Sequence, residues 1–166
     1  MSEAEAAWEQ RVAALWATID SFDEAEFVAR MDGLCAELPP GDPIGAFERG
    51  GAYDSTGHSD LAVPLYEAAL AQGLSGIRRR RAAIQLASSL RNLGEHERSI
   101  ELLEGELKLP DDELTGAVRA VLALALTNAG REREAVSVAL TALSEYLPRY
   151  NRSLARYAQE LIAEER

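Results

Sequence analysis

The sequence contains a single cysteine, few aromatic residues and no long apolar run. One cysteine excludes an intrachain disulfide, which is typical of proteins in a reducing compartment. Aromatic residues make up only 6% of the chain, and runs that alternate Val, Ile or Thr with polar residues are missing, so strands are not expected. No apolar stretch approaches the ~20 residues of a membrane span, and the acidic start MSEAEAAWEQ lacks the pattern of a secretory leader. We therefore expect a cytoplasmic protein that does not bind membranes.

Positive charge is scarce in the first half of the chain. Residues 1–75 hold 14 acidic residues against three basic ones, residues 76–166 hold 14 of each, and the formal net charge is −11. Because the first half would repel phosphates, nucleic acid is not an expected partner. The basic residues of the second half cluster at Arg78–Arg81 and at Arg149, Arg152 and Arg156.

Four consecutive arginines at a predicted helix start oppose the helix dipole. Either the acidic first half or a ligand must therefore compensate the run Arg78–Arg81. The acidic half is favoured, because it is present in every molecule.

Residues suited to catalysis or metal binding are also sparse. His58 and His96 each follow a turn glycine, but no second ligand lies at metal spacing, so we expect no metal or other cofactor. Cys35 has no histidine nearby in sequence and lies on an apolar helical face, so we expect a buried thiol rather than a nucleophile. Glycine-rich phosphate loops are missing. The sequence thus predicts a protein that is not an enzyme.

Apolar residues recur at helical spacing through most of the chain. The predicted helices cover 3–21, 23–37, 44–55, 59–72, 77–92, 96–109, 113–128, 132–146 and 149–164. Ser2 is a suitable N-cap for the first of them. Trp8 and Trp16 share one face of that helix, so we expect both to be buried, against the rest of the chain or against a second subunit.

Three glycines end helices at regular intervals. Gly57, Gly94 and Gly130 are 37 and 36 residues apart. A glycine after the last turn of a helix adopts the left-handed conformation at little cost, which lets the next helix fold back beside the first. Such a period indicates a stacked array of helix pairs, because one pair cannot bury its apolar side alone.

These residues resemble the tetratricopeptide repeat, whose pattern is W-x2-L-G-x2-Y in the first helix and A-x3-F in the second. The small residue of the pattern corresponds to Gly50, Ala87 and Ala123 in successive repeats. Its Tyr position corresponds to Tyr53, Leu90 and Leu126, and the Ala of the second helix corresponds to Ala62, Ser99 and Ala135. The resemblance implies an all-α array of helical hairpins in a right-handed superhelix, as in small bacterial cytosolic members of the family. The implied single domain comprises an N-terminal helix pair at 3–38, repeats at 44–73, 77–110 and 113–147, and a C-terminal capping helix at 149–164.

In this family the first helix of each pair lines a concave groove. The resemblance places these residues in it as a peptide-binding site: Arg81, Gln85, Ser88, Asn92, Asn128, Arg152 and Arg156. In the first repeat the same register selects Ile44, Glu48, Gly51 and Ser55. Arginine and asparagine in the groove favour an acidic or carboxylate-bearing segment, because the guanidinium binds a carboxylate through two parallel bonds. The alternative is that these arginines are solvated or paired with nearby glutamates.

The resemblance implies a non-catalytic scaffold or adaptor that binds an as yet unknown protein or peptide. Two alternatives stay open at this point. The N-terminal helix pair could form a homodimer or a larger homo-oligomer. The groove could instead serve a small-molecule sensor or an enzyme, which would need a deep pocket with perturbed titratable groups.

Overall fold

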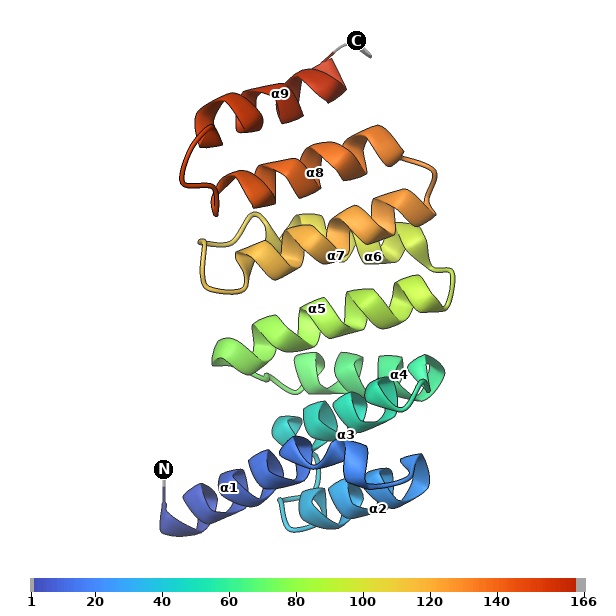
Figure 1. Cartoon of the computed structure of the whole chain (residues 1–166). Helices are drawn as coiled ribbons and strands as arrows, with labels where there is room; N and C mark the ends of the chain where they lie inside the picture. Colours follow the sequence, from blue (N-terminus) through green and yellow to red (C-terminus); the bar gives the residue numbers. More distant parts are fainter. Residues whose placement is uncertain (1, 164–166) are drawn as a thin grey trace. The chain divides into compact units, whose positions relative to one another are not determined.

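The computed structural model describes residues 2–163, and this range contains helices and no strand. The chain divides into two compact units, Met1–Ala82 and Ala83–Arg166. Figure 1 labels the helices of both. The prediction of an all-α helical-hairpin array is confirmed, whereas the assignment of the whole chain to one domain stays a prediction. None of the described helices is both long and apolar enough to cross a membrane.

The first unit is built from two helical hairpins. Its elements are α1 (Glu3–Ala17), the short 3-10 helix η1 (Ile19–Ser21), α2 (Glu24–Cys35), α3 (Pro43–Ser55), α4 (Ser59–Ala71) and the start of α5 (Gly76–Asn92). Consecutive α-helices pack on each other from α1 to α4. Ser2 is the N-cap of α1 as predicted, and its Oγ accepts a hydrogen bond from the Glu5 N–H at 3.2 Å.

The N-terminal hairpin is fastened by side chains that cross between α1 and α2. The indole Nε1 of Trp8 donates to the Leu34 carbonyl at 2.8 Å, and Trp8 is only 5% exposed. Arg11 binds the Glu37 carboxylate through both Nη atoms, at 2.7 and 2.6 Å. The predicted burial of Trp8 is confirmed, and Trp16 is partly buried. Both tryptophans thus contribute to the interior of this unit.

The second unit continues the hairpin pattern. It contains the rest of α5 with α6 (His96–Glu106), α7 (Thr115–Asn128), α8 (Glu132–Ser144) and α9 (Asn151–Ala163), and α6 to α9 pack in order. Its core is Ala87, Ile100, Leu103, Val118, Leu122, Ala123, Ala125, Leu126 and Ala135. The small side chains at repeat positions 87, 123 and 135 allow the helices to approach closely, as the repeat pattern requires.

One turn geometry ends the first helix of the three hairpins α3–α4, α5–α6 and α7–α8. Gly57, Gly94 and Gly130 have φ values of +83°, +82° and +75°. In each case the N–H of the next residue bonds at 2.9 Å to the carbonyl five residues before it, at Tyr53, Leu90 and Leu126 respectively. This is the Schellman arrangement, which satisfies carbonyl groups that the helix end would otherwise leave unpaired. The predicted left-handed glycines are confirmed.

Several predicted helix ends are placed differently by the structure. α2, α6 and α8 end at Cys35, Glu106 and Ser144 rather than at 37, 109 and 146, and α7 begins at Thr115 rather than at 113. The displaced ends of α1 and α9 have local causes. The first helix ends at Ala17 rather than at 21, and the Thr18 Oγ1 donates to the carbonyls of Ala14 and Leu15 at 3.0 and 3.1 Å. The last helix begins at Asn151 rather than at 149, because Tyr150 has a φ of +69° that a right-handed helix cannot contain. Its predicted last residue, 164, lies outside the described residues.

Replacing Gly94 with valine is expected to lower the free energy of unfolding by about 2 kcal/mol, because a β-branched side chain is strained at positive φ. Gly94→Asn is the matched control, since asparagine tolerates this conformation and should lose less. Chemical unfolding followed by circular dichroism measures both. Equal stability of the valine variant and the unmutated chain would contradict this account of the turn.

Candidate functional site

Two of the four first-repeat positions expected to line a groove are covered within the first unit, whereas Ser55 is exposed and Ile44 is partly buried. The predicted groove residues Glu48 and Gly51 are buried, with Glu48 only 3% exposed. The Glu48 Oε2 accepts from the indole Nε1 of Trp16 at 2.8 Å, and a Cβ on Gly51 would lie 3.1 Å from the Trp16 ring. Their assignment to an open groove is therefore wrong. The reason is that Trp16 of α1 lies on this face of α3, a contact between segments far apart in sequence.

The arginine run at the start of α5 lies partly against acidic side chains of the first unit. Arg78 forms ion pairs with Glu9 and Glu48. Burial disfavours the charged form of Arg78, but its hydrogen bonds to these carboxylates outweigh that effect and raise the pKa of the guanidinium. The prediction that the acidic half compensates the run is confirmed for Arg78. Arg81, a predicted site residue, is exposed and lies 5.3 Å from the centre of the Phe47 ring.

The other six predicted site residues belong to the second unit. Gln85 and Ser88 lie on α5 and are partly buried. The Oε1 of Gln85 is buried and has no hydrogen-bond partner in the described part of the chain. Asn92 and Asn128 are exposed, and each is the last residue of its helix, α5 and α7 respectively.

A third side chain joins the two asparagines. Arg91 donates from Nη1 to the Asn128 Oδ1 at 3.1 Å and from Nη2 to the Asn92 Oδ1 at 2.9 Å. These bonds connect the end of α5 to the end of α7. We refer to Arg91, Asn92 and Asn128 as the amide cluster.

Sequence reasoning missed Arg91, because the repeat register selects Asn92 and not the residue before it. A cation in the last turn of α5, next to one of two asparagines at equivalent repeat positions, was the signal that could have found it.

Three arginines gather at the start of α9, and only one of them has an acidic partner among the described residues. Arg149 and Arg152 are exposed and form no ion pair with any described residue. Arg156 is also exposed, but its Nε lies 3.5 Å from the Glu160 Oε1 and its guanidinium lies 4.9 Å from the centre of the Tyr157 ring. Of the alternative that these arginines are solvated or paired with glutamates, pairing applies to Arg156, whereas Arg152 is exposed to solvent.

The amide cluster and the α9 arginines lie at opposite ends of the second unit. α7 and α9 each pack on α8 and run in the same direction (Figure 1). Asn128 ends α7, whereas Arg152 stands in the first turn of α9. At 1.5 Å per residue, the length of α9 corresponds to about 20 Å. The sideways spacing of α7 and α9 adds to this length, so one small ligand cannot bridge the two groups, whereas an extended chain of more than about six residues can.

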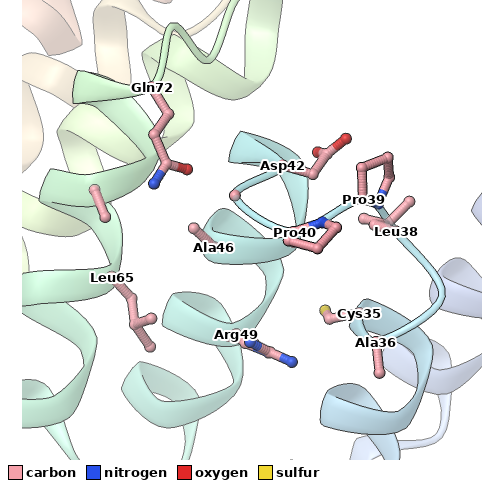
Figure 2. Close-up of a pocket in the computed structure, with 13 residues that line it drawn as sticks. Cys35, Ala36, Leu38, Pro39, Pro40, Asp42, Ala46, Arg49, Leu65 and Gln72 are labelled. Atoms are coloured by element: carbon pink, nitrogen blue, oxygen red, sulfur yellow. The ribbon is translucent and has the colours of Figure 1, made fainter.

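The first unit contains a hollow beside the only cysteine, with a volume of about 360 Å³ (Figure 2). The wall carries Cys35, Arg49 and Gln72 together with Pro39 and Pro40. Burial raises the pKa of the Cys35 thiol to about 11, so the thiol stays protonated at neutral pH. The Nε of Arg49 is 3.0 Å from the Asp32 Oδ1, which offsets its charge.

The hollow therefore contains no activated nucleophile, and its carboxylate, Asp42, accepts the Ile44 N–H at 2.8 Å as the N-cap of α3. The prediction that Cys35 is buried is confirmed, with 5% of the residue exposed. No cluster of three or more metal-ligating side chains occurs among residues 2–163.

A family model described as a tetratrico peptide repeat matches residues 43–161, which is more than half of the chain. No curated protein and no solved structure matches it. The matched range begins at α3 and ends within α9.

Proposed function

Because the chain belongs to the tetratricopeptide-repeat family, we propose that it is a non-catalytic scaffold that binds a segment of a partner protein. The segment is extended, carries an acidic side chain or a terminal carboxylate, and lies across α7 and α9. Its carboxylate meets Arg152, and its chain continues toward Asn128.

The observation that carries this proposal is the uncompensated positive charge at the start of α9. Residues 146–159 include three arginines and no acidic residue, and neither Arg149 nor Arg152 pairs with a described side chain. A guanidinium without a partner can form two charge-assisted bonds to an incoming carboxylate without first breaking an ion pair. The chain as a whole is acidic, so this local attraction supplies specificity rather than general affinity.

Apolar surface near these polar groups supports binding of a protein segment rather than of a free ion. Leu124 is 52% exposed and lies one turn before Asn128 on the same face of α7. Tyr157 on α9 is also 52% exposed. Tyrosine and arginine are enriched among residues that contribute most to protein interfaces.

Arg152→Ala is expected to weaken binding of the best segment about tenfold, because one charge-assisted hydrogen bond contributes ~1.5–3 kcal/mol and the site is open to solvent. Arg156→Ala should cost less, since Glu160 already engages that guanidinium. A peptide array probed at low salt selects the segments, and calorimetric titration of the variants measures the loss. Added salt should weaken binding to the unmutated chain.

Lys108→Ala is the matched control. Lys108 is an exposed cation after α6, so its removal changes the net charge by the same amount without touching α7 or α9. Basic or purely apolar hits on the array, or equal losses in the lysine and arginine variants, would overturn the acidic-segment proposal.

The alternatives of homo-oligomeric assembly and of a small-molecule site stay predictions. Trp8 and Trp16, on which the assembly alternative rested, both bond to residues within the first unit. No observation favours either alternative over the scaffold.

A further inference from the structure

Arg91 is absent from the predicted site, yet its guanidinium binds two of the predicted residues. The contacts are hydrogen bonds of 3.1 Å to the Asn128 Oδ1 and 2.9 Å to the Asn92 Oδ1. Its Nε is buried and has no hydrogen-bond partner among the described residues. The two amide oxygens therefore supply the polar contacts that hold this guanidinium in place.

The chemistry of arginine decides how the Asn128 amide is turned. A guanidinium has five donors and no acceptor, so only the carbonyl oxygen of an amide can face it. The NH2 group of Asn128 then points away from Arg91. An asparagine at an exposed helix end would otherwise rotate between its two amide orientations, because the terminal torsion is soft.

The position of Asn128 leaves its outward NH2 group accessible to a ligand. Asn128 ends α7, one turn beyond the exposed Leu124, and is itself exposed. A depression with a volume of about 460 Å³ adjoins it, with Gly94, Glu95, His96, Glu97, Arg98 and Ala129 as its other walls. This wall carries both acidic and basic side chains, so it does not favour an anion there. A neutral acceptor is compatible with this mixed charge.

We propose that Arg91 is a positioning residue that holds the Asn128 amide outward as a donor to a main-chain carbonyl of the bound segment. The inference rests on the proposed function and adds the other end of the bound segment to it. Arg152 binds the acidic group and Asn128 binds the backbone. The two lie more than a helix length of about 20 Å apart, so the bound segment spans more than about six extended residues. The first contact selects charge, and the second selects an extended main chain.

The positioning role can be tested without any ligand. The chain has three asparagines, at positions 92, 128 and 151, so a sample labelled with 15N at asparagine gives few side-chain amide signals. Arg91→Met should shift the Asn128 signals, whereas those of Asn151 serve as the control, because its Oδ1 accepts from the Arg152 N–H at 2.9 Å. Arg91→Lys should restore part of the shift. Unchanged Asn128 signals in Arg91→Met would overturn the inference.

The donor role is tested by a double-mutant cycle with an array-selected segment. Asn128→Ala is expected to weaken binding roughly threefold to tenfold, the range of one neutral hydrogen bond. Asn128→Asp should weaken it further, because the carboxylate can still face Arg91 but presents an acceptor to the segment. Arg91→Met should weaken binding in the unmutated background and have no added effect on Asn128→Ala, since Arg91 acts through Asn128.

The outcomes separate this inference from the proposed function. Equal effects of Arg91→Met in both backgrounds would mean that Arg91 touches the segment itself, and would overturn the positioning role. Full binding by Asn128→Ala would overturn the donor role and leave the Arg152 contact standing. An unmutated chain that binds no segment would overturn the proposed function and the donor role, and the asparagine signals would still decide whether Arg91 fixes the amide.

Discussion

Replacing Trp16 with alanine is expected to lower the free energy of unfolding of the first unit by about 3 kcal/mol. The indole packs edge-on against Phe27 with 5.1 Å between ring centres, covers Gly51 and donates to the buried Glu48. Truncation leaves a cavity beside Phe27. It also leaves the Glu48 Oε2 without its indole donor, and an unsatisfied buried acceptor is costly.

Trp16→Phe separates the two contributions, because it keeps most of the ring and removes only the N–H donor. We expect a loss of about 1 kcal/mol for this variant. Leu61→Ala is the control for loss of an exposed apolar side chain in the same unit, since Leu61 is 45% exposed. This replacement should lower the free energy of unfolding by about 0.5 kcal/mol. Denaturant unfolding followed by circular dichroism measures all three. A Trp16→Ala variant as stable as Leu61→Ala would show that α1 is not anchored on α3.

The helices could be predicted closely because their signals are local. The turns at positions 57, 94 and 130 have a positive φ, which favours glycine, and a Schellman turn involves only six neighbouring residues. The periodicity of apolar residues then decides which side of each helix is buried. Two of the displaced helix ends coincide with local features, namely the Thr18 hydroxyl bonded back to α1 and the left-handed Tyr150 before α9. Neither threonine nor tyrosine requires such a conformation, so the residue type alone does not predict these two helix ends.

The site could be predicted only in part because its contacts join distant segments. The register selected Glu48 and Gly51 for the groove, and no pattern in residues 1–38 indicates that Trp16 lies over them. The same register found Asn92 and Asn128 but not the arginine that holds both amides. Register identifies the face of a helix, whereas the partner of each side chain depends on the packing of neighbouring helices.

Replacing Gly50 with alanine is expected to destabilise the first unit by about 2 kcal/mol, although alanine is the better helix former. Gly50 lies within α3 at the small position of the repeat pattern, and a Cβ there would be 2.9 Å from two carbons of the Tyr66 ring. Tyr66 is fully buried, and the centres of the Tyr66 and Phe47 rings are 6.3 Å apart. The ring therefore has no free volume to move into, and overpacking of a close-packed core typically costs ~1–3 kcal/mol.

Gly105→Ala is the matched control, because Gly105 lies within α6 and a Cβ there meets no atom within 4 Å. That variant should be more stable than the unmutated chain by roughly 0.5–1 kcal/mol, the gain in helix propensity alone. Tyr66→Leu in the Gly50→Ala background should recover part of the loss, since the smaller side chain leaves room for the new methyl group. Thermal and denaturant unfolding of the four chains measure these differences. If both alanine variants gain stability equally, the close contact between α3 and Tyr66 of α4 does not determine the residue at this position of the repeat.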